Sequence, residues 1–119
     1  MNDAKRLGPP DFLPLKATHF HILLSCARGP VHGYGIRREV DDRTEGAILL
    51  SAATLYETLQ RLEKRGLITE TDPPAEGAEE ASSRWRFYRT TSLGDAVLAA
   101  EVARLESDLT AARAWLARS

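Results

Sequence analysis

The stretch from Ser51 to Ile68 carries its own start and stop signals for a helix. The Ser51 hydroxyl can cap the first turn by accepting a hydrogen bond from a free backbone amide. Gly66 follows two basic residues and stands where a left-handed glycine ends a helix. Apolar residues recur at i, i+4 and i+7 and make one buried face: Leu55, Leu59 and Leu62. The sequence therefore predicts one amphipathic helix followed by a short strand at residues 67–69.

The opposite face of this helix has small residues at its start and basic residues toward its end. At about 100° per residue, that face carries Ala53, Thr54, Glu57, Gln60, Arg61 and Lys64. Small side chains permit close approach to DNA, and basic side chains can reach phosphates or guanine. The pattern favours a helix inserted end-first into the major groove. The alternative is an ordinary amphipathic helix whose polar face contacts only water.

Length and charge allow one globular domain and do not by themselves indicate a nucleic-acid partner. The chain has 119 residues, of which 43% are hydrophobic, and a net charge of −1. The charge is uneven, because residues 72–83 carry −4 and residues 84–90 carry +3. A single cysteine excludes an intrachain disulfide. With no long apolar run and no secretion leader, the expected location is cytoplasmic, with no membrane partner.

Upstream, the sequence predicts an arm and two further helices. Residues 1–15 contain three prolines and are expected to form a flexible arm. A first helix is predicted over about residues 16–28, where Gly29-Pro30 ends it. The glycines of His32-Gly33-Tyr34-Gly35 mark a tight turn into a second helix over about residues 34–43. The buried side of the first helix is expected to comprise Phe20, Leu23, Leu24 and Ala27.

Downstream, a loop rich in proline, glycine and acidic residues separates two predicted strands. Residues 84–90 alternate charged and aromatic side chains, the period of a half-buried strand. This alternation predicts Trp85 and Phe87 on one face and the remaining side chains on the other: Arg84, Arg86 and Tyr88. Two strands joined by a long loop after an exposed helix indicate the wing of a winged helix.

The last segment predicts a long helix that pairs with a second copy of the chain. Thr91 or Ser92 is expected to cap this helix, which runs to about Arg118. Apolar residues recur with the 3.5-residue period of a coiled-coil seam: Leu98, Val102, Leu105, Leu109, Ala112 and Leu116. A helix of about 26 residues is roughly 39 Å long and overhangs so small a domain. The alternative is that the seam packs on the chain's own core.

Three groups of residues, in this order, resemble the PadR-like family of bacterial transcription regulators. The first group is His21-Ile-Leu-Leu, Gly29-Pro30 and His32-Gly33-Tyr34. The second is Thr54-Leu55-Tyr56, Leu59, Arg61-Leu62-Glu63 and Gly66-Leu67-Ile68. The third is Phe87-Tyr88-Arg89, Thr91 and Gly94. The resemblance extends over nearly everything from about residue 12 onward.

The resemblance implies a mainly α-helical winged helix-turn-helix with a small β-wing and a long C-terminal dimerisation helix. The expected parts are the arm 1–15, the DNA-binding domain 16–90 and the dimerisation helix 91–119. It also implies a homodimer that represses promoters and releases DNA when a small molecule binds. Two departures concern Ala52-Ala53, where the family usually has glycine in the second place, and the acidic wing tip Glu76–Glu80. We therefore expect wing contact with DNA at the base of the wing.

The candidate site residues follow from these patterns. The expected DNA contacts are Tyr34, Arg37, Ser51, Ala52, Ala53, Thr54, Tyr56, Arg61, Lys64, Arg84 and Arg86. A small, flat aromatic effector is expected near Trp85 or Trp115. No metal or other cofactor is expected, because His19 and His21 lie about 200° apart on a helix and cannot converge on one ion. No phosphate loop or nucleophile motif is present, so the chain is not expected to be an enzyme.

Two other function classes stay open. The near-neutral charge and acidic wing tip are compatible with a winged-helix protein-interaction module that does not bind DNA. A weaker alternative is a metal or redox sensor acting through Cys26, although a buried apolar role is expected for this residue. If DNA is the partner, the following basic residues should lie on one side: Arg37, Arg38, Arg61, Lys64, Arg84 and Arg86.

Overall fold

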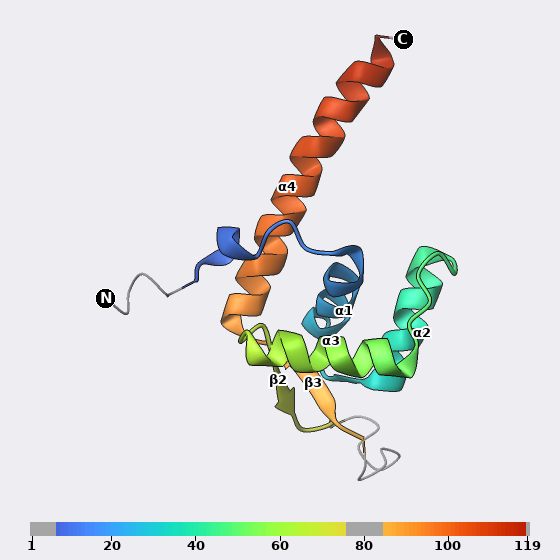
Figure 1. Ribbon diagram of the computed structural model, residues 1–119, viewed down its shortest axis with the longest axis vertical. Coiled ribbons are helices and arrows are strands. Elements are labelled where there is room, and N and C mark those ends of the chain that lie inside the picture. The colour runs from blue at the N-terminus through green and yellow to red at the C-terminus, as the bar shows by residue number, and fades with distance from the viewer. Residues whose placement is uncertain (1–6, 76–84, 119) are drawn as a thin grey trace.

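The computed structural model describes residues 7–75 and 85–118, which fold into four α-helices, one short 3-10 helix and a small antiparallel sheet (Figure 1). The elements are η2 (Pro9–Phe12), α1 (Ala17–Ala27), β1 (Val31–His32), α2 (Gly33–Thr44), α3 (Ala52–Lys64), β2 (Ile68–Thr71), β3 (Phe87–Thr90) and α4 (Ser92–Ala117). The predicted winged-helix architecture is confirmed, with helices and strands in the expected order. Arg84 and the predicted wing tip, 76–80, lie outside the described residues.

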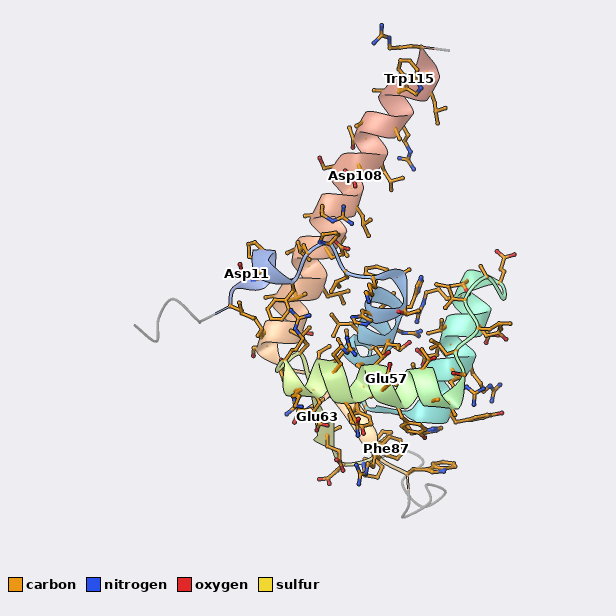
Figure 2. All side chains as sticks on the ribbon, in the orientation of Figure 1. Asp11, Glu57, Glu63, Phe87, Asp108 and Trp115 are labelled. Carbon is orange, nitrogen blue, oxygen red and sulfur yellow. The ribbon has the colours of Figure 1, made fainter. Side chains whose placement is uncertain are left out.

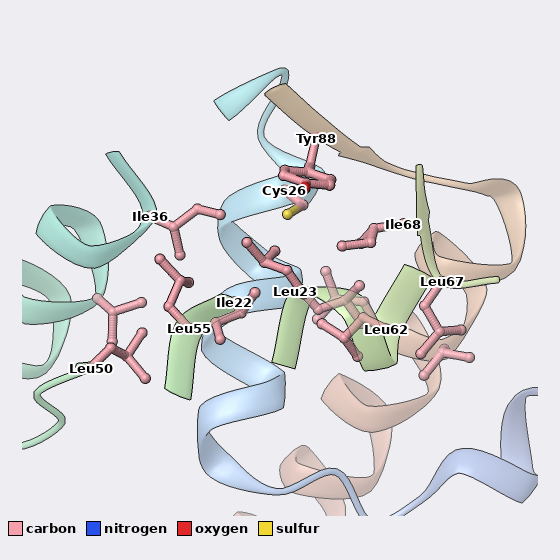
Figure 3. Close-up of a cluster of buried hydrophobic side chains, with 14 of the residues drawn as sticks. Ile22, Leu23, Cys26, Ile36, Leu50, Leu55, Leu62, Leu67, Ile68 and Tyr88 are labelled. Carbon is pink, nitrogen blue, oxygen red and sulfur yellow. The ribbon is translucent and has the colours of Figure 1, made fainter. Parts of the chain in front are cut away.

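Helix α1 is central, because α2, α3, α4 and β3 all pack against it. Figure 3 shows its Ile22 and Leu23 among side chains from the surrounding elements. The predicted buried side of α1 is correct for Leu23 and wrong for Ala27, which is exposed. Ser25 is buried instead, since its hydroxyl accepts a hydrogen bond from the Arg43 guanidinium at 3.1 Å. A helix enclosed on several sides has no single apolar stripe, which explains the difference.

The sheet has the order β1-β3-β2 and all its strands are antiparallel. Strands β2 and β3 pair from Ile68 opposite Thr90 to Thr71 opposite Phe87, and so form the wing. The two-residue strand β1 was not predicted. The predicted alternation is also wrong for β3, where Phe87 and Tyr88 are both buried. Tyr88 points into the helical core (Figure 3), whereas Phe87 packs edge-on against the His32 ring at 5.2 Å.

Helix α4 begins against the core and then extends away from it (Figure 1). The Thr91 hydroxyl caps it by accepting a hydrogen bond from the Gly94 amide at 3.0 Å. A side chain at Gly94 would overlap the backbone carbonyl of Leu67, so a residue without a Cβ is required at this close approach. Leu98, predicted in the dimer seam, is 8% exposed and belongs to the chain's own core. The first turns of α4 are therefore part of the winged domain.

The segment before α1 packs on α4. Phe12 is buried, and the Arg65 guanidinium lies 4.5 Å from the centroid of its ring. The Glu101 carboxylate, which is also buried, accepts a hydrogen bond from the Leu15 amide and pairs with Arg104. Residues 9–15 of the predicted arm are thus bound to the domain.

Candidate nucleic-acid interface

Helix α3 has the boundaries that its sequence signals predict. The Ser51 hydroxyl accepts a hydrogen bond from the Thr54 amide at 3.0 Å and so caps the first turn. Gly66 has a φ of +81°, the left-handed conformation that ends the helix without steric cost. The buried face comprises Leu55, Thr58, Leu59 and Leu62. Packing of this face fixes the direction in which the opposite face points.

The outward face of α3 is exposed along its whole length. Its members are Ala52, Ala53, Thr54, Tyr56, Glu57, Gln60, Arg61 and Lys64. The first turn offers little bulk, and the Thr54 hydroxyl is oriented by a 3.0 Å hydrogen bond from the Ser51 hydroxyl. Glu57 lies at the middle of the helix on this side (Figure 2) and can accept a hydrogen bond from a cytosine amino group.

A cavity of about 290 Å³ lies where α2, α3 and β3 meet. It is lined by His32, Gly33, Tyr34, Tyr56, Gln60, Trp85, Arg86 and Tyr88. A Cβ at Gly33 would lie 3.0 Å from the Tyr56 hydroxyl, so glycine lets the tyrosine ring lie against the start of α2. Burial raises the pKa of Tyr88, and a hydrogen bond with Arg86 partly opposes this shift. Three predicted site residues therefore converge here: Tyr34, Tyr56 and Arg86.

The cavity adjoins two surface hollows that contain the other basic candidates. One hollow shares Gln60 with the cavity and is lined by Glu57, Gln60, Arg61, Glu63 and Lys64. The other shares Tyr34 with the cavity and is lined by Tyr34, Arg37, Arg38, Asp41, Leu49 and Leu50. Because the three sites share residues, they form one continuous surface, called here the α3 face. Acidic side chains alternate with basic ones along it.

Two arginines of α2 on the α3 face differ in their bonding. The Arg37 Nε donates a hydrogen bond to the Leu50 carbonyl at 2.9 Å and so holds the link between α2 and α3. The Arg38 guanidinium lies 5.9 Å from the centroid of the exposed Tyr34 ring. Arg37 therefore has a structural role in addition to the predicted one, whereas Arg38 stands beside a phenol.

Sequence reasoning did not assign His32 and Gln60 to the site. His32 belongs to the His32-Gly33-Tyr34 motif, and its Nδ1 accepts a hydrogen bond from the Gly35 amide at 3.2 Å, which caps α2. Gln60 already stood on the predicted polar face of α3. The long-range pairing of Trp85 with His32, whose ring centroids are 4.4 Å apart, had no signal in the sequence.

The remaining histidines and the cysteine lie apart from the α3 face cavity. Burial, followed by Lys16, Arg61 and Arg65, lowers the pKa of His19 below its usual value. His21 lies 3.2 Å from Arg43, and burial and then this cation lower its pKa. Burial, aided by Glu39, raises the pKa of the Cys26 thiol to about 12, which does not favour a redox sensor. Over residues 7–75 and 85–118, no group of three His, Cys, Asp or Glu residues could hold a metal ion.

The two tryptophans do not meet within one chain. Trp85 precedes β3 at the base of the wing, whereas Trp115 is near the far end of α4. Figure 2 shows Trp115 and Phe87, close in sequence to Trp85, at opposite ends of the structure. The two residues cannot contact one effector within a single copy of the chain.

The distal half of α4 carries an exposed part of the predicted seam. Leu109 is 51% exposed, and the neighbouring apolar positions at seam spacing are also open: Val102, Ala112 and Leu116. Leu105 is half-buried. Within the described chain, no helix combines the length and apolarity needed to cross a membrane.

Comparison with known proteins gives a consistent result. The family described as "Transcriptional regulator PadR-like family" matches residues 22–100. A transcriptional regulator of Mycobacterium tuberculosis is 33% identical over 90 residues, which cover 76% of this chain and 77% of that relative. A protein of Lysinibacillus sphaericus named "Uncharacterized protein X" is 37% identical over 67 residues, 56% of this chain. The alignment spans 58% of that relative, less than two thirds of its length.

The fold also matches solved structures. PadR of Bacillus subtilis, in a crystal structure with operator DNA, superposes with a TM-score of 0.60 and 19% identity. The match covers 75% of this chain and 48% of that chain. At this identity the likeness shows a shared fold.

Proposed function

We propose, since the chain belongs to the PadR-like family of transcriptional regulators, that it represses transcription by binding operator DNA as a homodimer. The observation that carries this proposal is the α3 face, on which an exposed helix is flanked by basic and phenolic side chains from α2 and the wing base. The PadR structure of Bacillus subtilis with operator DNA supports the proposal, because the same fold binds DNA in that protein.

The first turn of α3 is assigned to base recognition. Ala52, Ala53 and Thr54 are exposed at the end of the helix that has no buried neighbour ahead of it. Alanine and the threonine methyl can contact thymine methyl groups, and a threonine hydroxyl can contact base edges. Their small size permits the backbone of α3 to approach the floor of the major groove.

The basic and phenolic side chains around this turn are assigned to phosphates. Arg61 and Lys64 lie toward the carboxyl end of α3, and Arg86 lies at the wing base. The Tyr34 and Tyr56 hydroxyls line the cavity between them and are exposed. Hydrogen bonds to phosphate fix the register of a protein on DNA without reading its sequence.

The dimer is assigned to the distal half of α4. An exposed row with heptad spacing would be covered by the same row of a second copy. Two-fold symmetry then presents two α3 helices to the DNA, so the operator should be a pseudo-palindrome with half-sites about one helical turn, roughly 34 Å, apart.

The test is DNA affinity measured at several salt concentrations. Arg61→Ala and Lys64→Ala should each weaken binding to all duplexes and reduce the slope of log affinity against log salt by about one. Arg28→Ala is the matched control, because its side chain is 67% exposed and lines a hollow that shares no residue with the α3 face. If Arg61→Ala and Lys64→Ala behave like Arg28→Ala, the protein-interaction alternative gains support.

A further inference from the structure

The cavity between α2, α3 and β3 has an aromatic lining that phosphate binding does not require. Five of its described lining residues carry rings: His32, Tyr34, Tyr56, Trp85 and Tyr88. Its volume of about 290 Å³ is at the lower end for small-molecule sites, which span about 300–1,000 Å³. Such sites combine apolar walls with a few polar groups that orient the ligand.

The rings of this cavity are held in place before any ligand binds. His32 stacks on Trp85, with a centroid distance of 4.4 Å and an interplanar angle of 26°. Tyr34 lies parallel to the same imidazole at 6.4 Å, and Phe87 supports it edge-on. The Gly35 amide fixes the imidazole through Nδ1, and burial lowers its pKa, so the ring is neutral at pH 7. The result is a rigid aromatic surface.

A large part of this aromatic surface faces water. Trp85 is 46% exposed, Tyr56 is 54% exposed and Tyr34 is 60% exposed. Clustered exposed aromatic groups mark binding sites, because covering them removes apolar area from water. A phosphate would hydrogen-bond to the hydroxyls and leave the ring faces uncovered.

The polar groups of the cavity favour an anion. Of the described residues that line it, Arg86 alone carries a full charge, and the Gln60 amide and the tyrosine hydroxyls can donate hydrogen bonds. A carboxylate forms strong charge-assisted hydrogen bonds with a guanidinium. The described lining contains no carboxylate that would repel it.

We propose that this cavity binds a small planar aromatic carboxylate and that the bound molecule excludes DNA. The aromatic ring stacks against Trp85 and the carboxylate pairs with Arg86. The exclusion rests on the proposed function, in which Tyr34, Tyr56 and Arg86 contact phosphates. Ligand and DNA then compete for the same donors, so the ligand acts at the DNA-binding surface itself.

Ligand binding is measured first without DNA, by calorimetry, on the full chain. The probe is naphthalene-2-carboxylate, which should bind saturably with one site per chain. Cyclohexanecarboxylate keeps the charge without the flat ring, and naphthalene-2-carboxamide keeps the ring without the charge. Each should bind about tenfold more weakly or worse, because each lacks one of the two interactions.

Two variants identify the site. Trp85→Leu should weaken binding of the naphthalene carboxylate about tenfold, since base-sized rings gain comparable affinity by stacking on aromatic side chains. Arg86→Gln should remove the preference for the carboxylate over the carboxamide. Trp115→Leu is the matched control, because it removes an exposed tryptophan at the far end of α4 and should leave ligand affinity unchanged. Thermal unfolding of each variant checks that the domain is intact.

Competition is measured with a random-sequence duplex at low ionic strength. The readout is the ratio of DNA dissociation constants with and without the naphthalene carboxylate, so each variant serves as its own reference. The ratio should be large for the unmodified chain and fall toward one for Trp85→Leu. No saturable binding, equal binding by Trp85→Leu, or simultaneous binding of ligand and DNA overturns the proposal. Failure to bind the duplex without ligand would instead overturn the proposed function.

Discussion

The Glu101 carboxylate accepts a hydrogen bond from the Leu15 backbone amide at 2.9 Å, and so joins the segment before α1 to the long helix α4. The same carboxylate pairs with Arg104 on α4. Because Glu101 is 1% exposed, its charge depends on these two partners. The contact is polar, yet it lies beside the apolar core.

The first prediction concerns the pH dependence of this contact. The hydrogen bond from Arg104 lowers the pKa of Glu101 below its ordinary value of 4.5, burial opposes the shift, and the Leu15 amide adds to it. Glu101→Gln should lower the free energy of unfolding by about 1 kcal/mol at neutral pH. A lowered folded-state pKa stabilises the fold above pH 4.5, and that contribution is lost as the pH falls through the folded value.

Urea unfolding of both proteins at pH 7 and at about pH 3 measures this effect. The difference between them should shrink at the lower pH. Glu106→Gln is the control, because Glu106 is exposed on the same helix. A difference independent of pH would contradict the assignment.

The second prediction concerns Gly94. Alanine favours helix over glycine by about 1 kcal/mol, so Gly94→Ala would stabilise an open site. Here its Cβ would overlap the Leu67 carbonyl, so we expect the free energy of unfolding to fall by about 1–3 kcal/mol. Chemical denaturation measures the change, and Ala99→Gly, at an exposed position of α4, shows the propensity effect alone. A more stable Gly94→Ala would show that α4 does not approach β2 this closely.

The third prediction concerns assembly. Leu109→Glu should dissociate the proposed dimer, because pairing would bury an unpartnered charge. Leu109 is 51% exposed in one chain, so the fold of the monomer should persist. Thr110→Glu is the control, since it adds the same charge at the next exposed position. Sedimentation at micromolar concentration distinguishes the two, and a monomeric unmodified chain would contradict the proposal.

The fourth prediction concerns sequence recognition. Thr54→Ala should cost about 1–3 kcal/mol at one operator position and relax base preference there, with the salt dependence unchanged. Binding to single-base-pair variants of a duplex selected from a random pool measures this. Thr110→Ala, on the outer part of α4, should leave the preference intact. A uniform loss across all duplexes would assign Thr54 to phosphate contact instead.

Local signals explain why helix α3 could be predicted closely. The Ser51 cap, the leucine spacing and Gly66 all act within a few residues, and each is found as expected. Strand β1 depends instead on pairing with β3, more than 50 residues away, and two residues carry no pattern of their own. Sequence reasoning therefore missed it.

Tertiary packing likewise explains the errors at the end of β3 and in α4. Phe87 is buried by His32 and Tyr88 by the helical core, so both faces of β3 are covered and the expected alternation fails. Leu98 fits a heptad in sequence, yet the buried side of α4 there includes Val97 and Glu101. The α3 face was predicted through its basic residues, whereas the cavity depended on His32 meeting Trp85.

The two hydrogen bonds of Thr91 have a mechanical consequence. Its hydroxyl donates to the Gly66 carbonyl, where α3 has just ended, and accepts from the Gly94 amide in the first turn of α4. With its backbone amide also bonded to Leu67, this residue makes a stiff joint between the two helices. In a dimer paired through α4, any change in the crossing angle of the long helices would reach α3 undamped. The separation of the two α3 helices, and hence the half-site spacing that they fit, would change with that angle.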